Sequence, residues 1–105
     1  MGAFLLKEFT MQQYIKLRKI RKQIHDNLNL DRGFTRTEKK YIKIWTTKYN
    51  YDFDIISFAL HYTSNKRDPN FAYIHCLLSD WYHKGFITKE NILQWLNLIK
   101  KKYNR

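Results

Sequence analysis

Hydrophobic residues recur every three or four positions from Met11 to Leu28, a spacing that places them on one face of a helix. This apolar stripe consists of Tyr14, Leu17, Ile20, Ile24 and Leu28. The opposite side of the same helix carries Arg18, Lys19 and Lys22. The pattern predicts an amphipathic helix with a basic outer face, followed by a connector over residues 29–34 that contains Asp-Arg-Gly.

A second helix is predicted to begin at Thr35, because Glu38 three residues later completes a capping-box pattern. Its predicted buried face consists of Tyr41, Ile42, Trp45 and Tyr49. Its lysines are predicted to lie largely outside the core, at Lys39, Lys40 and Lys43. A third helix is predicted to start near Asp52, a favourable N-cap residue. The residues of that helix predicted to face the core are Ile55, Ile56, Ala59 and Leu60.

The polar segment Ser64–Pro69 is predicted as a loop, and a fourth helix follows from about Asn70. The helical spacing there involves Phe71, Ile74, Leu77, Leu78 and Trp81. Gly85 stands where a left-handed C-terminal cap is expected. Thr88 then opens a fifth helix that runs through Ile92, Trp95, Leu96 and Ile99. The basic tail over residues 100–105 is expected to fray.

These elements predict an all-α fold, a compact bundle of about five helices. The chain has 105 residues, 44% of them hydrophobic, but only three glycines and one proline, which suits a few long helices better than many strands. We divide it into an N-terminal basic helix and connector (1–33), a helical domain (34–99) and a basic tail (100–105).

The charge of the chain indicates a polyanionic partner. Twenty Lys and Arg residues face nine Asp and Glu, giving a formal net charge of +11. Such a domain favours nucleic acid or an anionic membrane surface as its ligand. The alternative is a solvated, lysine-rich surface that reflects an AT-rich genome, since Lys, Asn, Ile and Tyr are all abundant.

The location of the protein is predicted to be cytoplasmic. Cys76 is the only cysteine, so an intrachain disulfide is impossible and a reducing compartment fits. The apolar cluster Phe4–Leu6 is too short for a signal peptide, and no apolar run is long enough to span a membrane. We therefore expect no membrane partner.

Enzymatic signatures are absent from the sequence, and we expect neither catalysis nor a cofactor. The isolated glycines form no phosphate-binding loop and no nucleophile elbow. Asp52 and Asp54 fit a helix start better than an acid–base pair. A metal site could be imagined from His75, Cys76, Asp80 and His83, but one cysteine makes a half-buried thiol and surface histidines the better interpretation.

The first helix allows three interpretations. Its apolar stripe packs on its own domain, or it pairs with a second copy to give a homo-oligomer, or the helix lies on an anionic membrane. The membrane interpretation is weakened because the tryptophans lie in other predicted helices.

Tyr73, Leu77 and Trp81 follow one another at steps of four on the fourth predicted helix. Such a stripe usually belongs to a core. Tyr and Trp rings at a surface edge can also stack on unpaired bases, and the two roles are compatible if the stripe borders the core.

The same three residues carry a resemblance to a known family. The spacing Tyr73-x-x-x-Leu77-x-x-x-Trp81 is similar to the Tyr-x-x-x-Ile-x-x-x-Trp motif of DnaD domains, with Leu in place of Ile. The similarity covers roughly Phe34 to Trp95 and includes four further stretches of the chain: Ile44-Trp45, Ile55–Leu60, Pro69–Ile74 and Lys84–Thr88.

The resemblance implies a DnaD-like helical domain from a bacterial primosome or phage replication protein. Such proteins help to load the replicative helicase together with a loader or initiator, and they are not catalysts. It implies DNA contact, with a single-strand contribution, by Tyr73, Leu77, Trp81, the nearby Lys84 and the tail residues Lys100, Lys101, Lys102 and Arg105. Arg18, Lys19 and Lys22 add basic charge.

A protein adaptor without DNA binding of its own is the alternative function. Full-length DnaD proteins carry a self-assembling winged-helix domain before this one, and the residues ahead of Phe34 are too few to form it. The chain is therefore interpreted as an excised domain or as a short phage-like version.

Overall fold

The computed structural model describes residues 10–61 and 69–103, without the side chains of residues 102 and 103. All regular structure in this part is helical, which confirms the predicted all-α fold. The elements in order are α2 (Met11–Leu28), α3 (Arg36–Lys43), the π-turn η1 (Ile44–Lys48), α4 (Phe53–His61), α5 (Phe71–His83) and α6 (Lys89–Tyr103).

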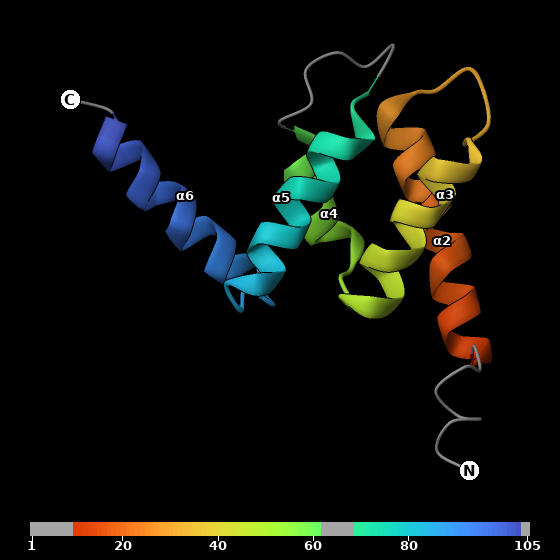
Figure 1. Cartoon of the computed structure of the whole chain (residues 1–105), viewed down its shortest axis with the longest axis horizontal. Coiled ribbons are helices and arrows are strands. Elements are labelled where there is room, and N and C mark those ends of the chain that lie inside the picture. The colour runs from red at the N-terminus through yellow and green to blue at the C-terminus, as the bar shows by residue number, and fades with distance from the viewer. Residues whose placement is uncertain (1–9, 62–68, 104–105) are drawn as a thin grey trace.

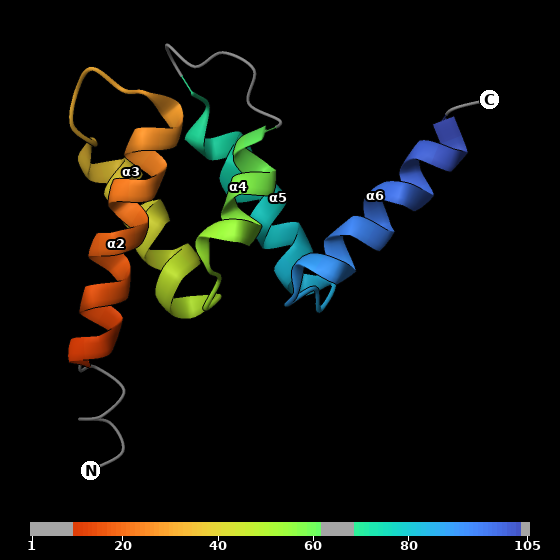
Figure 2. The ribbon, with the colours of Figure 1, turned by 180° about the vertical axis from the view of Figure 1, so that it is seen from behind.

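The helices are arranged in sequence across the molecule. Figure 1 shows α2 and α3 side by side at one end, α4 and α5 packed together in the middle, and α6 extending away at the other end. The view from behind in Figure 2 shows the same order. The first and last described helices, α2 and α6, consequently lie at opposite ends of a molecule whose longest extent is 55 Å.

One hydrophobic core joins all the helices. Trp45 of η1 and Trp81 of α5 are fully buried at its centre, and α2 contributes its predicted stripe, Leu17, Ile20, Ile24 and Leu28. The predicted inner face of α4 is buried as well: Ile55, Ile56, Ala59 and Leu60. Because the α2 stripe is covered by the chain itself, the first helix packs on its own domain and does not offer that stripe to a second copy.

Tyr14 is a correction to the predicted stripe, since 47% of its surface is exposed. A step of three residues turns a helix by about 300°, so Tyr14 stands about 60° away from Leu17 around the helix axis. Its ring lies instead beneath the Arg18 guanidinium, 6.0 Å from the ring centroid.

The helix ends follow local capping chemistry. The predicted capping box is present, with the Thr35 hydroxyl accepting from the Glu38 backbone N–H and the Glu38 carboxylate accepting from the Thr35 N–H. Gly85 has φ +81°, so the predicted left-handed cap is also confirmed. Asn29 and Asn50 take the same conformation at the ends of α2 and η1, a role that asparagine tolerates better than most residues.

The π-turn was not predicted. It widens the end of the second helix, where the Tyr49 N–H donates to the Ile44 carbonyl at 3.0 Å. Thr46 and Thr47 donate their hydroxyls back to the carbonyls of Ile42 and Lys43. Threonine hydroxyls that bond one turn back compete with the backbone ladder and bend helices, which accounts for the widened turn.

The C-terminal tail differs from the prediction, because residues 100–103 continue α6 as regular helix. Lysine is a good helix former, and cations at a helix C-terminus are favoured by the helix dipole. Residues 104–105 lie outside the described residues. The predicted loop Ser64–Pro69 does too, apart from its last residue, the buried Pro69.

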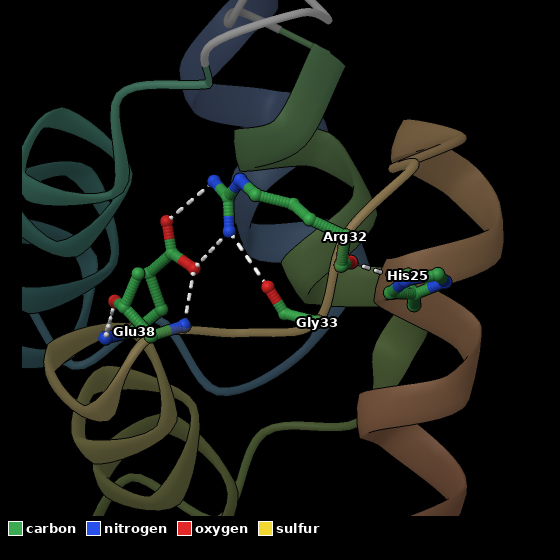
Figure 3. A network of polar contacts seen from close by, with 5 residues as sticks. His25, Arg32, Gly33 and Glu38 are labelled. Carbon is green, nitrogen blue, oxygen red and sulfur yellow. Dashed lines mark hydrogen bonds and ion pairs between the residues drawn. The ribbon is translucent and has the colours of Figure 1, made fainter.

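The connector between α2 and α3 is held by one ionic network (Figure 3). The Arg32 guanidinium donates to both carboxylate oxygens of Glu38 at 2.9 Å, and also to the Gly33 carbonyl at 2.8 Å. The backbone carbonyl of Arg32 lies 2.8 Å from the His25 Nε2. The Arg32 hydrogen bonds hold the pKa of Glu38 below its usual range against the opposing effect of burial, and the Thr35 N–H lowers it further.

Glu38→Gln is expected to lower the free energy of unfolding by about 1–2 kcal/mol, because it removes a charge-assisted bidentate pair that is partly exposed on the Arg32 side. Chemical denaturation at pH 7 measures the change, with Asp31→Asn in the same connector as the control. Because the pKa of Glu38 is lower in the folded state than in the unfolded state, ionisation of this carboxyl stabilises the fold. This stabilisation is fully present above the pKa of the unfolded carboxyl and is lost as the pH falls through the pKa of the folded one. The difference between Glu38→Gln and wild type should therefore shrink in acid, and equal stabilities at pH 7 would contradict this role.

Candidate nucleic-acid interface

The residues predicted to bind DNA lie in three separate places. Arg18, Lys19 and Lys22 are exposed on α2, while Lys100 and Lys101 are exposed on α6 at the opposite end of the molecule (Figure 1). The remainder belong to α5 and the turn after it. The side chain of Lys102 and the whole of Arg105 lie outside the described residues. The predicted set therefore does not form one surface.

Two of the predicted lysines are engaged in ion pairs within their own helical turns. Lys22 lies 3.3 Å from Asp26, and Lys84 lies 2.6 Å from Asp80. Both pairs are exposed, and such pairs stabilise a fold by only about 0.3–0.5 kcal/mol. Each of these lysines can therefore leave its carboxylate and bind a phosphate at little cost in stability. The carboxylate of its former partner, Asp26 or Asp80, remains on the same part of the surface.

The stripe of Tyr73, Leu77 and Trp81 passes from solvent into the core. Tyr73 is 45% exposed, Leu77 is partly buried and Trp81 is 0% exposed. Each step of four residues rotates a helix by about 40°, so two steps turn the stripe by about 80°. Of the two aromatic residues in the motif, only Tyr73 can meet a ligand in this conformation.

Trp81 instead packs at the junction of α5 and α6. Its indole meets Trp95 edge to face, with centroids 6.0 Å apart, and the Phe86 backbone N–H donates to its carbonyl at 2.9 Å. Among the described residues its Nε1 has no hydrogen-bond acceptor. Of the two roles open to Trp81, base stacking or packing, the geometry supports packing.

The larger basic surface lies on α3, whose lysines were predicted only to lie outside the core. Residues 10–50 hold eleven Lys and Arg against three Asp and Glu, a net charge of +8. Residues 51–61 and 69–101 hold four of each and are neutral. The exposed cations of this charged part include Arg36, Lys39, Lys40, Lys43 and Lys48, which lie on α3 and η1, the elements that pack against α2. The packing of α2 on α3 and η1 makes these charged helices neighbours, which no linear motif in the sequence could have indicated.

Four aromatic rings are stacked between α3, η1 and α5 beside the basic surface. The column runs from Tyr41 to His75 (centroids 4.7 Å apart), on to Tyr49 (6.3 Å) and then to Tyr82 (4.3 Å). Neighbouring rings in the column are within 26° of parallel. Most of these rings are therefore held by their neighbours before any ligand arrives.

His75 in this column is anchored as a neutral ring. Its Nδ1 accepts a hydrogen bond from the Trp45 Nε1 at 3.0 Å, which places the remaining ring proton on Nε2. Burial lowers the pKa of His75, and the nearby positive charge of Lys48 lowers it further. The expected surface histidine is thus a partly buried structural one, whereas His83 is exposed.

An open groove of about 540 Å³ lies on α3 at Tyr41, the first ring of this column. Its walls combine an aromatic ring, two ammonium groups and a hydroxyl: they are Thr37, Lys40, Tyr41, Lys43 and Ile44. A second groove of about 560 Å³ lies between α2 and α4, where Lys16 pairs with Asp52 at 3.1 Å. The second groove is lined by two lysines and two aspartates and is self-neutralised, so the first is the better anion site.

Metal ligation receives no support from the described residues, where no three His, Cys, Asp or Glu side chains gather. Cys76 is exposed on α5, so its predicted half-burial is wrong. It lies on the outer side of the helix, because the core takes the positions of Ile74, Leu78 and Trp81.

Trp81→Ala is expected to lower the free energy of unfolding by about 3–5 kcal/mol, because it empties the site of a fully buried indole. Tyr73→Ala is the matched comparison on the same stripe and should change it by less than about 1 kcal/mol. Guanidinium denaturation followed by circular dichroism measures both. A Trp81→Ala protein as stable as wild type would show that the indole is not part of the core.

Comparison with known families identifies the chain more closely. The family described as "Replication initiation and membrane attachment" (DnaB_2) matches residues 22–95, well over half of the chain, and confirms the resemblance seen over Phe34 to Trp95. Comparisons with curated proteins and with solved structures gave no significant match. None of the described helices is long and apolar enough to cross a membrane. The chain therefore belongs to the DnaD-like family of replication-initiation domains.

Proposed function

We propose that the protein binds DNA during replication initiation, and that it does so through the basic outer surface of α2 and α3. The observation that carries this proposal is the placement of the charge. The net charge of +8 lies within residues 10–50, and the helices of that segment pack side by side. Exposed cations so arranged attract a phosphate backbone and release its condensed counterions on binding.

The surface is suited to phosphates rather than to base edges. Its charged groups are mainly lysines, which act as mobile point charges, and we expect little sequence preference. Lys100 and Lys101 on α6 extend the reach of the protein along a strand but lie far from the main surface (Figure 1). Tyr73 adds an exposed ring, while Trp81 contributes by packing.

A role in helicase loading follows from the family resemblance. The partners would be the replicative helicase, its loader or an initiator protein, and the domain would act as an adaptor without catalysis. An acidic patch on such a partner would compete with DNA for the same cations. If the chain binds no DNA, this adaptor function is the alternative.

The charge-reversal variant Lys39→Glu/Lys40→Glu is expected to weaken binding to any DNA sequence by about tenfold or more at 0.1 M salt. It should also reduce the log–log salt slope by about two phosphate contacts. Fluorescence anisotropy with labelled oligonucleotides across a salt series measures both quantities.

Lys100→Glu/Lys101→Glu makes the same change of charge on α6 and serves as the comparison. A larger effect of the α6 variant would move the site to the tail, as the family resemblance implies. No binding by the wild-type protein, even at low salt, would leave the adaptor function in its place.

An anionic membrane surface is a second candidate ligand, favoured by the first turns of α2. Met11 and Ile15 are 71% and 57% exposed, and they share the outer side of the helix with Arg18 and Lys22. Apolar side chains beside cations suit a helix that lies in a lipid headgroup layer. The description of the family also includes membrane attachment.

Ile15→Ser is expected to lower the fraction of protein that sediments with phosphatidylglycerol vesicles by several-fold, because it removes an apolar anchor without changing the charge. Vesicles of phosphatidylcholine alone provide the control and should retain little of either protein. Equal sedimentation of wild type and Ile15→Ser would remove the case for this ligand.

A further inference from the structure

We propose that Tyr41 is the stacking platform for an unpaired base of single-stranded DNA, with Lys40 and Lys43 binding the flanking phosphates. This inference rests on the proposed DNA binding and deepens it, because it assigns a strand preference to a particular groove. Tyr41 lies on α3 within the basic surface, and it is the aromatic residue that lines the 540 Å³ groove.

The ring of Tyr41 is already oriented for stacking. The ring stacks on His75, with the centroids 4.7 Å apart and the planes 26° from parallel, and it lies within 5° of parallel to Trp45 at 6.2 Å. His75 is fixed in turn by the hydrogen bond from Trp45, and Tyr49 stacks beyond it. A base that stacks on Tyr41 from the groove extends an existing column of rings, so little side-chain entropy is lost on binding.

The groove also supplies the charge that a strand needs on either side of a stacked base. Lys40 precedes Tyr41 directly, and Lys43 follows it by two positions, with Ile44 providing an apolar wall. Single-strand binding sites in general combine aromatic platforms with cations that follow the backbone. A duplex keeps its bases stacked on one another and can use only the cations, so this groove should favour single strands.

Two exposed rings on α5 lack this combination. Tyr82 ends the same column by stacking on Tyr49 at 4.3 Å, but it is not part of the lysine-lined groove. Tyr73 shares its side of α5 with Asp80, seven residues later, whose carboxylate repels phosphates. Tyr82 therefore offers a matched control: an exposed ring on the same column without the basic groove.

The test compares binding of a labelled single strand and a duplex of equal length by fluorescence anisotropy. Tyr41→Leu is expected to weaken single-strand binding about tenfold and to leave duplex binding within about twofold, because the loss of one stacked base is confined to unpaired strands. Tyr41→Phe should bind as wild type, since it keeps the ring. Tyr82→Leu should change neither affinity.

A second measurement keeps the wild-type protein and varies the DNA, so it does not depend on the stability of a variant. An abasic single strand has the same phosphates but no bases, and wild type should bind it about tenfold more weakly than the normal strand. Tyr41→Leu, checked for folding by circular dichroism, should discriminate between the two strands far less. Equal discrimination by both proteins would overturn the assignment of the stacked base to Tyr41.

The outcomes separate the two proposals. The assignment of the stacking platform to Tyr41 is wrong if Tyr41→Leu weakens the binding of single strands and of duplex equally, or weakens neither. It is also wrong if Tyr82→Leu weakens single-strand binding more than Tyr41→Leu does. DNA binding by α2 and α3 still stands in those cases if Lys39→Glu/Lys40→Glu weakens both kinds of DNA. If the wild-type protein binds no DNA at all, the proposed function and this inference fail together.

Discussion

The bidentate pair between Arg32 and Glu38 is the constraint on which the shape of the charged surface depends. It closes the connector between α2 and α3 with two 2.9 Å bonds, and the same carboxylate caps the first turn of α3 (Figure 3). One side chain therefore fixes both where α3 begins and how it meets α2. Without that junction the cations of the two helices would remain, but the connector would lose the ion pair that ties it to the start of α3.

This arrangement has an electrostatic cost. A net charge of +8 confined to residues 10–50 means that neighbouring helices repel each other at low ionic strength. The opposing attraction comes from apolar burial, above all by Trp45 and the α2 stripe of four residues. A bound polyanion would remove the repulsion and leave the packing intact. The same charge that weakens the free fold thus supplies the driving force for the proposed ligand.

Periodicity and capping chemistry predicted most of the fold, because both act over a few residues. The capping box at Thr35 and the left-handed cap at Gly85 are local consequences of side-chain hydrogen bonding and of a missing Cβ. The interface was harder to predict, because it depends on which helices become neighbours. The lysines of α3 have the pattern of any solvated face, and only their position beside α2 distinguishes them. The π-turn was not predicted either, because two consecutive threonines in a sequence seldom indicate one.

The burial of Trp81 changes what the family motif means for this chain. Its indole packs on Trp95, and its carbonyl accepts from the Phe86 N–H. The Phe86 carbonyl in turn accepts from the Tyr51 hydroxyl at 2.7 Å, and burial raises the pKa of Tyr51 to about 12, which keeps that donor protonated. Trp81 therefore belongs to the contacts that fix the turn between α5 and α6, and with it the direction in which α6 carries Lys100 and Lys101. A motif tryptophan can influence strand binding in this way without touching a base, so loss of binding after its substitution would be evidence of contact only if the fold survived.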